Sequence, residues 1–333
     1  MKGFVLQLDT MNYQQSSSIL EKINQSKNIL INSHRSPDSD SVSSSTTVSA
    51  VLKNLGKNSQ IICPDEVDAH LHFIHGASEI KKVDYATFDF SPYDLFIILD
   101  TSSWEQVANI KNYIPPTIDT IVIDHHLTNE VEGMIKLVDT KASATAEIVY
   151  KILQDWNIKP TSEDATALFS GLADDTVFFR YTHDAAAAYS IASELIKAGA
   201  DKDLFVHEMY NKYDLTAIKF LGKILAEMKI EDNFVWSAIP NAVYLEYGKP
   251  EAGKELAANL FSQSIKDTEF GFIIIEKEPG IISISFRSKG KVNVAALSKR
   301  LGGGGHHNAA GCTIKGDFNE SVKKIIAEAK NAK

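Results

Sequence analysis

Short apolar runs alternate with longer segments of helical periodicity through the first part of the chain. The runs at 28–32, 59–63, 94–99 and 120–123 are compact and apolar, which predicts buried strands. Between them, apolar residues recur at helical spacing, as in 41–55. Strands that alternate with helices form a parallel sheet. The pattern therefore predicts an α/β fold class, with a parallel-sheet domain that has helices on both faces.

The pattern changes after about residue 229, where β-rich segments become more frequent. Strands are predicted at 234–239, 270–275 and 281–286, with a helix at 252–261 between them. No stretch rich in Pro, Gly and Ser separates the two parts, so we expect a stiff, helical connection. The expected boundaries are 1–205 for the parallel-sheet domain, 206–228 for the helical linker and 229–333 for a smaller α/β C-terminal domain.

Composition places the chain among ordinary globular proteins. Of 333 residues, 44% are hydrophobic and 23% are charged, which excludes collagen-like and wholly disordered chains. The apolar runs stay far below the roughly 20 residues that cross a bilayer. Residues 1–9 lack a sustained apolar core and a small-residue cleavage site, so no secretory signal is expected. We therefore expect a cytoplasmic protein that does not contact membranes.

Charge is distributed unevenly along the chain. The net charge of -9 argues against a protein that coats long nucleic acids, because such binding neutralises many phosphates. Residues 229–333 hold 15 Lys and Arg against 12 Asp and Glu, a balance of +3, which leaves 19 against 31, or -12, for residues 1–228. This asymmetry favours cations bound by the acidic part and phosphates held by the basic part. Cys63 and Cys312 lack the spacing of a thiolate metal site.

Residues of the types that bind metals follow several of the predicted strands. The carboxyl ends of parallel strands meet at one edge of a sheet, so these side chains are expected to converge. They are His34, Asp38 and Asp40 after the first strand, Asp100 after the third, Asp124, His125 and His126 after the fourth, and a separate pair, Asp174 and Asp175.

Carboxylates that lie together in a partly buried cleft repel one another, and cations offset that cost. Imidazole and carboxylate ligands without thiolates favour manganese, magnesium or a similar divalent ion. An aspartate can bridge two such ions roughly 3.5 to 4 Å apart, an arrangement that promotes phosphoryl displacement. Asp100 is the residue we expect to form this bridge. Taken singly, Asp38 and Asp40 also fit ordinary turn and cap positions.

The C-terminal part carries a second polar motif. Residues 287–289 end a predicted strand, and a glycine run follows at 302–305. Glycines let backbone amides approach an anion, and an arginine can hold a phosphate through two hydrogen bonds. A flexible turn is an alternative interpretation of the glycine run. The candidate substrate-binding residues are Arg287, Ser288, Lys289, Gly304, Gly305 and His306.

With these motifs the sequence resembles the DHH phosphoesterase superfamily, in particular its two-domain branch of nanoRNA exonucleases and pAp phosphatases. The motifs are His34–Asp40, Asp100–Ser102, Asp124–His126, Ser143–Glu147, Asp175–Thr176, Arg287–Lys289 and Gly303–His306. The resemblance implies one metal ion held by His34, Asp38 and Asp100, and another held by Asp40, Asp100, His125 and Asp175. It also implies a catalytic group of Asp100, Asp124 and His126, with His126 facing the scissile phosphate.

The implied activity is manganese-dependent hydrolysis of short RNA to mononucleotides, together with removal of phosphate from pAp. Magnesium and cobalt are alternatives for the two divalent ions. Hydrolysis of linear or cyclic di-adenosine nucleotides stays open, as does a nucleotide sensor without turnover. We expect short RNA or small phosphorylated nucleotides as partners, no groove for long polymers, and no membrane partner. A homodimer is among the oligomeric states left open.

Three positions depart from the family pattern. Ser39 and Val177 stand where glycine is frequent, and Trp104–Gln106 stands where an acidic residue and an arginine are usual. None of these changes removes a proposed metal ligand. They therefore bear on substrate preference more than on the type of reaction.

Overall fold

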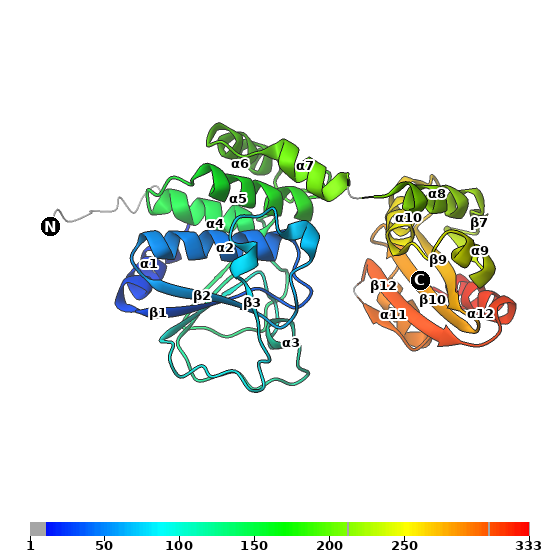
Figure 1. Ribbon diagram of the computed structural model, residues 1–333, viewed down its shortest axis with the longest axis horizontal. Helices are drawn as coiled ribbons and strands as arrows, with labels where there is room; N and C mark the ends of the chain where they lie inside the picture. Colours follow the sequence, from blue (N-terminus) through cyan, green and yellow to red (C-terminus); the bar gives the residue numbers. More distant parts are fainter. Residues whose placement is uncertain (1–10, 212, 306, 333) are drawn as a thin grey trace. The chain divides into compact units, whose positions relative to one another are not determined.

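The computed structural model describes residues 11–211, 213–305 and 307–332. The chain divides into two compact units, 1–212 and 213–333, each with a sheet of its own (Figure 1). Among the described residues, no helix is long and apolar enough to cross a bilayer.

The first unit is built on a parallel sheet, which confirms the fold predicted from the alternation of strands and helices. Its six strands lie in the order β3-β2-β1-β4-β5-β6. The chain runs outward in one direction from β1 and in the other from β4, so the crevice at their carboxyl ends is where ligands bind in such sheets. The strands are β1 Asn28–Asn32, β2 Asn58–Cys63, β3 Lys81–Lys82, β4 Leu95–Leu99, β5 Thr120–Asp124 and β6 Ile135–Val138.

Helices cover both faces of this sheet. Figure 1 shows α1, α2, α4 and α5 on one face and the short α3 on the other. On the second face, α3 packs with apolar and aromatic residues of the irregular segments 83–93 and 110–118 over Leu30, Phe96 and Val122. The helices are α1 Gln15–Gln25, α2 Ser39–Asn54, α3 Trp104–Ala108, α4 Thr145–Asp155, α5 Ser162–Asp175, α6 Ala185–Lys197 and α7 Lys202–Tyr210, with 3-10 turns at Ala69–Leu71 and Ala77–Glu79.

Helix α2 is buried although it is rich in serine and threonine. Several of its hydroxyls are satisfied locally, because Ser43, Ser45 and Thr46 each donate to the carbonyl oxygen three residues earlier. Small side chains also let α5 approach closely. A Cβ atom added at Gly171 of α5 would lie 2.3 Å from the Ser43 Oγ atom and 2.8 Å from the Asp40 Oδ1 atom. The lack of a side chain at Gly171 thus sets how near α5 comes to the first turn of α2.

The second unit has a mixed sheet between two layers of helices. Its six strands lie in the order β11-β12-β10-β9-β8-β7, and only β8 and β9 pair in parallel. One hydrophobic cluster involves α11 and α12, and the other involves α8 and α10. The strands are β7 Lys229–Glu231, β8 Phe234–Ile239, β9 Phe270–Glu278, β10 Ile281–Ser288, β11 Gly304–Gly305 and β12 Ala309–Lys315. The helices are α8 Leu215–Ala226, α9 Asn241–Glu246, α10 Glu251–Ser264, α11 Val294–Arg300 and α12 Phe318–Lys330.

The boundary between the units differs from the helical linker expected over 206–228. That range contains the end of α7, which belongs to the first unit, and all of α8, which belongs to the second. Phe220 and Ile224 of α8 are fully buried in the core of the second unit. The apolar periodicity of this segment therefore serves the core of the second unit.

Candidate metal centre

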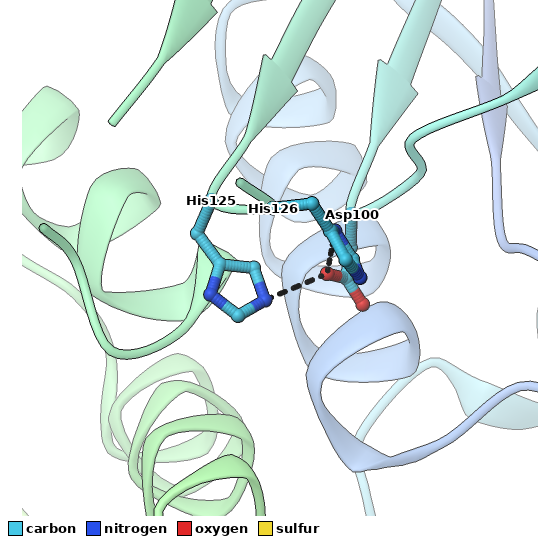
Figure 2. A group of neighbouring side chains, drawn as sticks. All are labelled: Asp100, His125 and His126. Atoms are coloured by element: carbon cyan, nitrogen blue, oxygen red, sulfur yellow. Dashed lines mark ion pairs between the residues drawn. The ribbon is translucent and has the colours of Figure 1, made fainter. Parts of the chain in front are cut away.

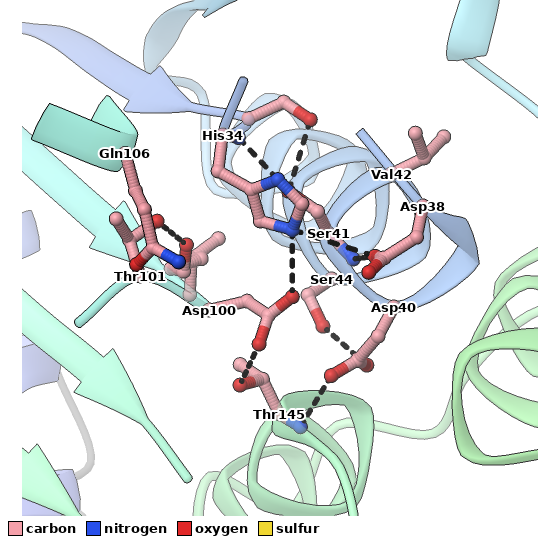
Figure 3. Close-up of polar contacts among 12 residues, drawn as sticks. His34, Asp38, Asp40, Ser41, Val42, Ser44, Asp100, Thr101, Gln106 and Thr145 are labelled. Carbon is pink, nitrogen blue, oxygen red and sulfur yellow. Dashed lines mark hydrogen bonds and ion pairs between the residues drawn. The ribbon is translucent and has the colours of Figure 1, made fainter. Parts of the chain in front are cut away.

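The expected histidines and aspartates of the first unit converge beside the carboxyl ends of β1, β4 and β5. Figure 3 shows His34, Asp38 and Asp40 around Asp100, and Figure 2 shows His125 and His126 beside it. Their side chains form adjoining groups in which all potential ligand atoms lie within 4.8 Å of one another. Because Asp100 and His125 each belong to more than one group, the groups form a continuous site. The groups are His34 with Asp38 and Asp100, Asp40 with His125 and Asp175, and Asp100 with His125 and His126.

The carboxylate of Asp100 lies at the centre of the site. Its Oδ2 atom is 3.3 Å from His34 Nε2 (Figure 3), and its Oδ1 atom is 3.5 Å from His125 Nε2 (Figure 2). The Oγ1 hydroxyl of Thr145 donates to Oδ1 at 3.1 Å. Burial opposes ionisation of Asp100, but hydrogen bonds from the two histidines outweigh it and lower the pKa of the carboxyl. Asp100 also has a φ of 53°, a left-handed conformation that aspartate tolerates better than most residues.

Asp40 lies in the first turn of α2 and is fully buried. The first amides of α4 hold it, since the N–H of Thr145 donates to Oδ2 at 2.6 Å and that of Ala146 to Oδ1 at 2.8 Å. A helix N-terminus favours a negative charge. Burial and the nearby Asp100 nevertheless raise the pKa of Asp40 to about 8.

Asp175, at the end of α5, completes the acidic part of the site. Burial and the charge of Asp40 raise the pKa of its carboxyl well above the usual range. Protein groups alone therefore do not stabilise full ionisation of these acids at neutral pH. A divalent cation would supply the missing positive charge, and the oxygen and imidazole donors match such an ion. The chain thus contains a site with the chemistry of a divalent metal centre.

The two histidines that flank Asp100 present one ring nitrogen to the carboxylates. His34 Nε2 is 3.5 Å from Asp38 Oδ1, while its Nδ1 atom contacts the carbonyl oxygen of Arg35 at 2.8 Å. A carbonyl partner on the opposite nitrogen is common among metal-binding histidines, because it fixes the orientation of the ring. Although burial opposes the charged form, Asp38 and Asp100 raise the pKa of His34 well above its ordinary value.

His125 contacts the acids on the other side of the site. Its Nε2 atom is 3.2 Å from Asp175 Oδ2. Burial opposes its positive charge, but Asp100 and the neighbouring carboxylates raise its pKa to about 10. Both histidines are therefore surrounded by negative charge, which in a metal-bound protein a cation would neutralise in place of their protons.

His126 differs from its neighbour in exposure and in partner. Its side chain is 38% exposed, against 15% for His125. Its Nδ1 atom lies 2.6 Å from the Oδ1 atom of the buried Asp124. Burial lowers the pKa of His126, but the hydrogen bond to Asp124 and the charge of Asp100 raise it above its ordinary value. His126 therefore lies at the accessible side of the site.

The candidate substrate-binding residues of the second unit lie at one end of its sheet. Arg287 of β10 pairs with Ala309 of β12, and β12 pairs in turn with β11 at Gly304 and Gly305. The Arg287 Nε atom donates to Asn259 Oδ1 at 3.1 Å. His306 lies outside the described residues.

Much of this second motif also has a structural explanation. Lys289 Nζ donates to the carbonyl oxygen of Ile265 at 2.5 Å. The Oγ atom of Ser288 accepts from the N–H of Gly290 at 3.1 Å. A Cβ atom at Gly305 would lie 2.5 Å from the Ala310 Cα atom, so close pairing of β11 with β12 requires glycine. These contacts leave the turn interpretation of the glycine run open beside the ligand interpretation.

The positions that depart from the family pattern adjoin the metal centre. Val177 has a φ of 49°, and Phe178 and Phe179 follow at 56° and 63°. A β-branched residue in the left-handed region is strained, whereas glycine is not. The turn is held by Thr176, whose Oγ1 atom accepts from the N–H of Phe179 at 2.9 Å. Val177, in place of the usual glycine, therefore places backbone strain two residues after Asp175.

Glu105 and Gln106, which also depart from the family pattern, form contacts beside the loop after Asp100. The Gln106 Oε1 atom accepts hydrogen bonds from the N–H and Oγ of Ser102, at 3.0 and 2.9 Å. Glu105 forms an ion pair with Arg35, with 3.1 Å between Oε1 and Nη1. These side chains therefore fix the loop between Asp100 and α3.

The sequence did not point to every residue that shapes the site. Thr145 belongs to a motif of the family pattern, but its contacts with both Asp40 and Asp100 are visible only in three dimensions. Gly171 has no signal beyond being a glycine within a helix. Asn129 reads as an ordinary polar loop residue, and yet it donates to Asp124 Oδ2 at 2.6 Å.

Comparison with known proteins gives the family of this chain. The sequence profile of the DHH family, N-terminal domain, matches residues 28–172, and that of the DHHA1 domain matches residues 242–332. A crystal structure of an exopolyphosphatase-related protein from Bacteroides fragilis superposes with a TM-score of 0.85 at 26% identity, covering 95% of this chain and 96% of that one. The chain therefore belongs to the DHH family, and it carries a DHHA1 domain. It is a phosphoesterase of that family by its two domains and by the ligand groups of the first unit.

Two kinds of curated relatives are similar to the chain to about the same degree. The bifunctional oligoribonuclease and PAP phosphatase NrnA of Thermus thermophilus is 26% identical over 307 residues, which cover 90% of this chain and 88% of that protein. The cyclic-di-AMP phosphodiesterase GdpP of Bacillus subtilis is 27% identical over 330 residues, which cover 93% of this chain and 48% of that protein. The chain therefore spans about half the length of GdpP.

Proposed function

We propose that the protein is a manganese-dependent phosphoesterase that hydrolyses short oligoribonucleotides to mononucleotides and removes phosphate from pAp. The observation that carries the proposal is the position of Asp100. Its carboxylate lies between His34 and Asp38 on one side and His125 on the other, with Asp40 and Asp175 beyond. A shared carboxylate between two sets of donors is the arrangement that holds a pair of divalent ions.

In this proposal each residue of the centre has a defined role. When bound, the two ions polarise the phosphoryl oxygens and acidify a water molecule. Thr145 supports both acids, because its hydroxyl donates to Asp100 and its N–H donates to Asp40. One ion would be held by His34, Asp38 and Asp100, and the other by Asp40, Asp100, His125 and Asp175.

His126 and Asp124 form the part of the centre that acts on the substrate. In its doubly protonated, imidazolium form, His126 faces the scissile phosphate and donates a hydrogen bond from Nε2 to a phosphoryl oxygen. Asp124 accepts the hydrogen bond from His126 Nδ1 and so orients the ring. His126 therefore stabilises the negative charge that develops on the phosphoryl group.

The second unit would hold the part of the nucleotide that does not react. Arg287 offers a planar donor group that suits a phosphate. Backbone amides beside the glycine run add donors without side-chain obstruction. The proposed contact residues are Arg287, Ser288, Lys289, Gly304, Gly305 and His306.

The choice of short RNA and pAp is supported by relatives that bear those activities in their names. Besides the Thermus protein, the bifunctional oligoribonuclease and PAP phosphatase NrnA of Bacillus subtilis is 25% identical over 292 residues. The second candidate is hydrolysis of linear or cyclic di-adenosine nucleotides, which the similarity to the cyclic-di-AMP phosphodiesterases favours. A sensor that binds nucleotides without turnover is the alternative outside enzymes.

A substrate panel tests the proposal. It contains pAp, a linear adenine dinucleotide, a five-nucleotide RNA, cyclic di-AMP and pyrophosphate, each with manganese and with a chelator. We expect mononucleotide release from the short RNA and phosphate release from pAp, both only with manganese. Turnover confined to the di-adenosine compounds would favour the second candidate, and nucleotide binding without turnover would favour the sensor.

A further inference from the structure

Asn129 lies in the loop after β5, and both the Nδ2 and the Oδ1 atoms of its side chain form hydrogen bonds. Asn129 Nδ2 donates to Asp124 Oδ2 at 2.6 Å and to the carbonyl oxygen of Thr101 at 2.9 Å. Asn129 Oδ1 accepts from the N–H of Val131 at 2.9 Å. Turning the amide by 180° would set its oxygen against two acceptors, so the network fixes the orientation of this side chain.

The contact with Asp124 connects Asn129 to the metal centre. Asp124 is fully buried, and its two oxygens have different partners: His126 Nδ1 on Oδ1 and Asn129 Nδ2 on Oδ2. An ionised carboxylate only accepts hydrogen bonds, so the proton between the two side chains belongs to His126 Nδ1. The opposite ring nitrogen, Nε2, is then the atom with which His126 can meet a ligand.

The contact with Thr101 connects the same loop to the segment that follows β4 and contains Asp100. Thr101 directly follows Asp100, so its carbonyl oxygen moves with the backbone of that residue. The His126 Nδ1 atom lies 3.9 Å from Asp100 Oδ1. One amide group therefore links the support of His126 to the segment that holds the shared carboxylate.

We propose that Asn129 is a positioning residue, which holds Asp124 so that His126 keeps Nε2 toward the reacting phosphate at a fixed distance from Asp100. This inference rests on the proposed function, in which His126 faces that phosphate. Asn129 acts through Asp124 and His126 and is not itself a catalytic residue. Without its amide, Asp124 Oδ2 loses a short buried hydrogen bond, and the carboxylate is free to turn with the imidazole that it orients.

A double-mutant cycle tests this inference. Wild type, Asn129→Ala, His126→Ala and the double variant are compared on short RNA and on pAp at saturating manganese. In the wild-type background, Asn129→Ala is expected to lower kcat roughly 10- to 100-fold and to leave KM within about threefold. In the His126→Ala background, the same change is expected to have no further effect, because its route to the phosphate is already absent. Equal losses in both backgrounds would overturn the inference, as would wild-type kcat in Asn129→Ala.

Asn28→Ala is the matched control. Asn28 begins β1, at the end of the strand away from the site, and its Nδ2 atom donates to the carbonyl oxygen of Pro92 at 3.1 Å. The kcat of the Asn28→Ala variant is expected to stay within about twofold of wild type. If kcat falls as much in Asn28→Ala as in Asn129→Ala, then loss of any asparagine hydrogen bond in this unit is enough to lower activity. That result would contradict the route through Asp124 and His126.

Manganese titration and thermal unfolding separate positioning from loss of the metal. Asn129→Ala is expected to bind manganese with wild-type stoichiometry and with an affinity within a few-fold, because no ligand is removed. If Asn129→Ala loses manganese, the substitution acts by disturbing Asp100, and this would contradict the route through His126. If Asn129→Ala does not fold, Asn129→Ser replaces it in the cycle, since its hydroxyl can still donate to one acceptor; a smaller loss with the same dependence on His126 is expected.

Failure of the proposed function gives a different result from failure of this inference. If wild type hydrolyses RNA or pAp but the effects of Asn129→Ala and His126→Ala on kcat are additive, only the positioning role of Asn129 is contradicted. If wild type hydrolyses neither, the cycle is repeated on bis(p-nitrophenyl) phosphate, a phosphodiester without bases. Coupling between Asn129 and His126 in that reaction would support the positioning role without the natural substrate. A wild type that hydrolyses no phosphoester would overturn both proposals.

Discussion

The two units place their charged residues in different environments. In the first unit, Asp40 and Asp100 are buried among other acids and two histidines. In the second, Lys289 is exposed and donates to backbone oxygen, and Arg287 is half-buried and donates to the carbonyl oxygen of its neighbour Phe286 at 3.0 Å. Clustered buried carboxylates destabilise a fold unless a cation accompanies them, whereas cations paired with backbone oxygen stabilise it. The first arrangement therefore points to a ligand more strongly than the second.

The largest expected effect comes from removing the shared carboxylate. Asp100→Asn should lower kcat at least about 100-fold, because the bridge between the two sets of metal donors is lost. Steady-state hydrolysis of short RNA and pAp measures this effect. Asp94→Asn is the matched control, since Asp94 accepts hydrogen bonds from Lys27 and Asn28 at the opposite ends of the strands. A folded Asp100→Asn variant with near-normal activity would remove Asp100 from the centre.

Manganese should stabilise the first unit and leave the second unit unchanged. Binding at about 100 times Kd adds about 2.7 kcal/mol to the free energy of unfolding of a domain that holds the ion. Hydrogen exchange read by mass spectrometry should show added protection in β1 and β4 but none in β9. Equal protection of both units would contradict the assignment of the metal to the first unit, and so would no protection in either.

An effect of intermediate size is expected from substitutions of the candidate substrate-binding residues in the second unit. Arg287→Ala should raise KM about 10-fold, or about 1.4 kcal/mol, and change kcat little, because a contact with the non-reacting end of the nucleotide is lost. Lys289→Ala should raise KM less, since Lys289 Nζ already binds Ile265 and Thr268. Kinetics on pAp and on short RNA distinguish the two variants. Unchanged kinetics of Arg287→Ala on every nucleotide would leave this motif with structural roles alone.

The smallest expected effect is a gain in stability beside the metal centre. Val177→Gly should raise the free energy of unfolding by roughly 0.5–1 kcal/mol, because relief of the left-handed strain exceeds the entropy lost by glycine. Chemical denaturation of the metal-free protein measures the change. Val177→Ala is the control, since alanine keeps the Cβ atom that causes the strain. A Val177→Gly variant no more stable than Val177→Ala would contradict the strain argument.

The strands and helices around the metal centre were predictable because the first sheet is buried on both faces. The runs predicted at 28–32 and 120–123 match β1 and β5 to within one residue. Elements with weak or mixed periodicity were not predicted. β6 is short and half-buried, and the irregular segments 83–93 and 110–118 cover the second face of the sheet with apolar and aromatic residues that follow no helical or strand spacing.

The convergence of the candidate ligand residues was predictable from their types and their positions after strands, but their supporting contacts were not. His34 and Asp100 are far apart in the sequence, and topology alone brings their strands together. The contacts of Thr145 and Asn129 depend on how closely the start of α4 and the loop after β5 approach Asp40, Asp100 and Asp124, which no local pattern encodes. The core that α8 joins was not predictable for a related reason, since periodicity shows that this helix has an apolar face but not which core that face joins.

The contact between Gly171 and Asp40 makes the metal centre sensitive to helix packing. Asp40 lies where α2, α4 and α5 meet, held by the amides of α4 and covered by a position that leaves no space for a methyl group. A shift of any of these helices by the width of a methyl group would turn the carboxylate. Metal affinity in this protein therefore reports on the packing of its core, and substitutions far from every ligand can act on the chemistry through it.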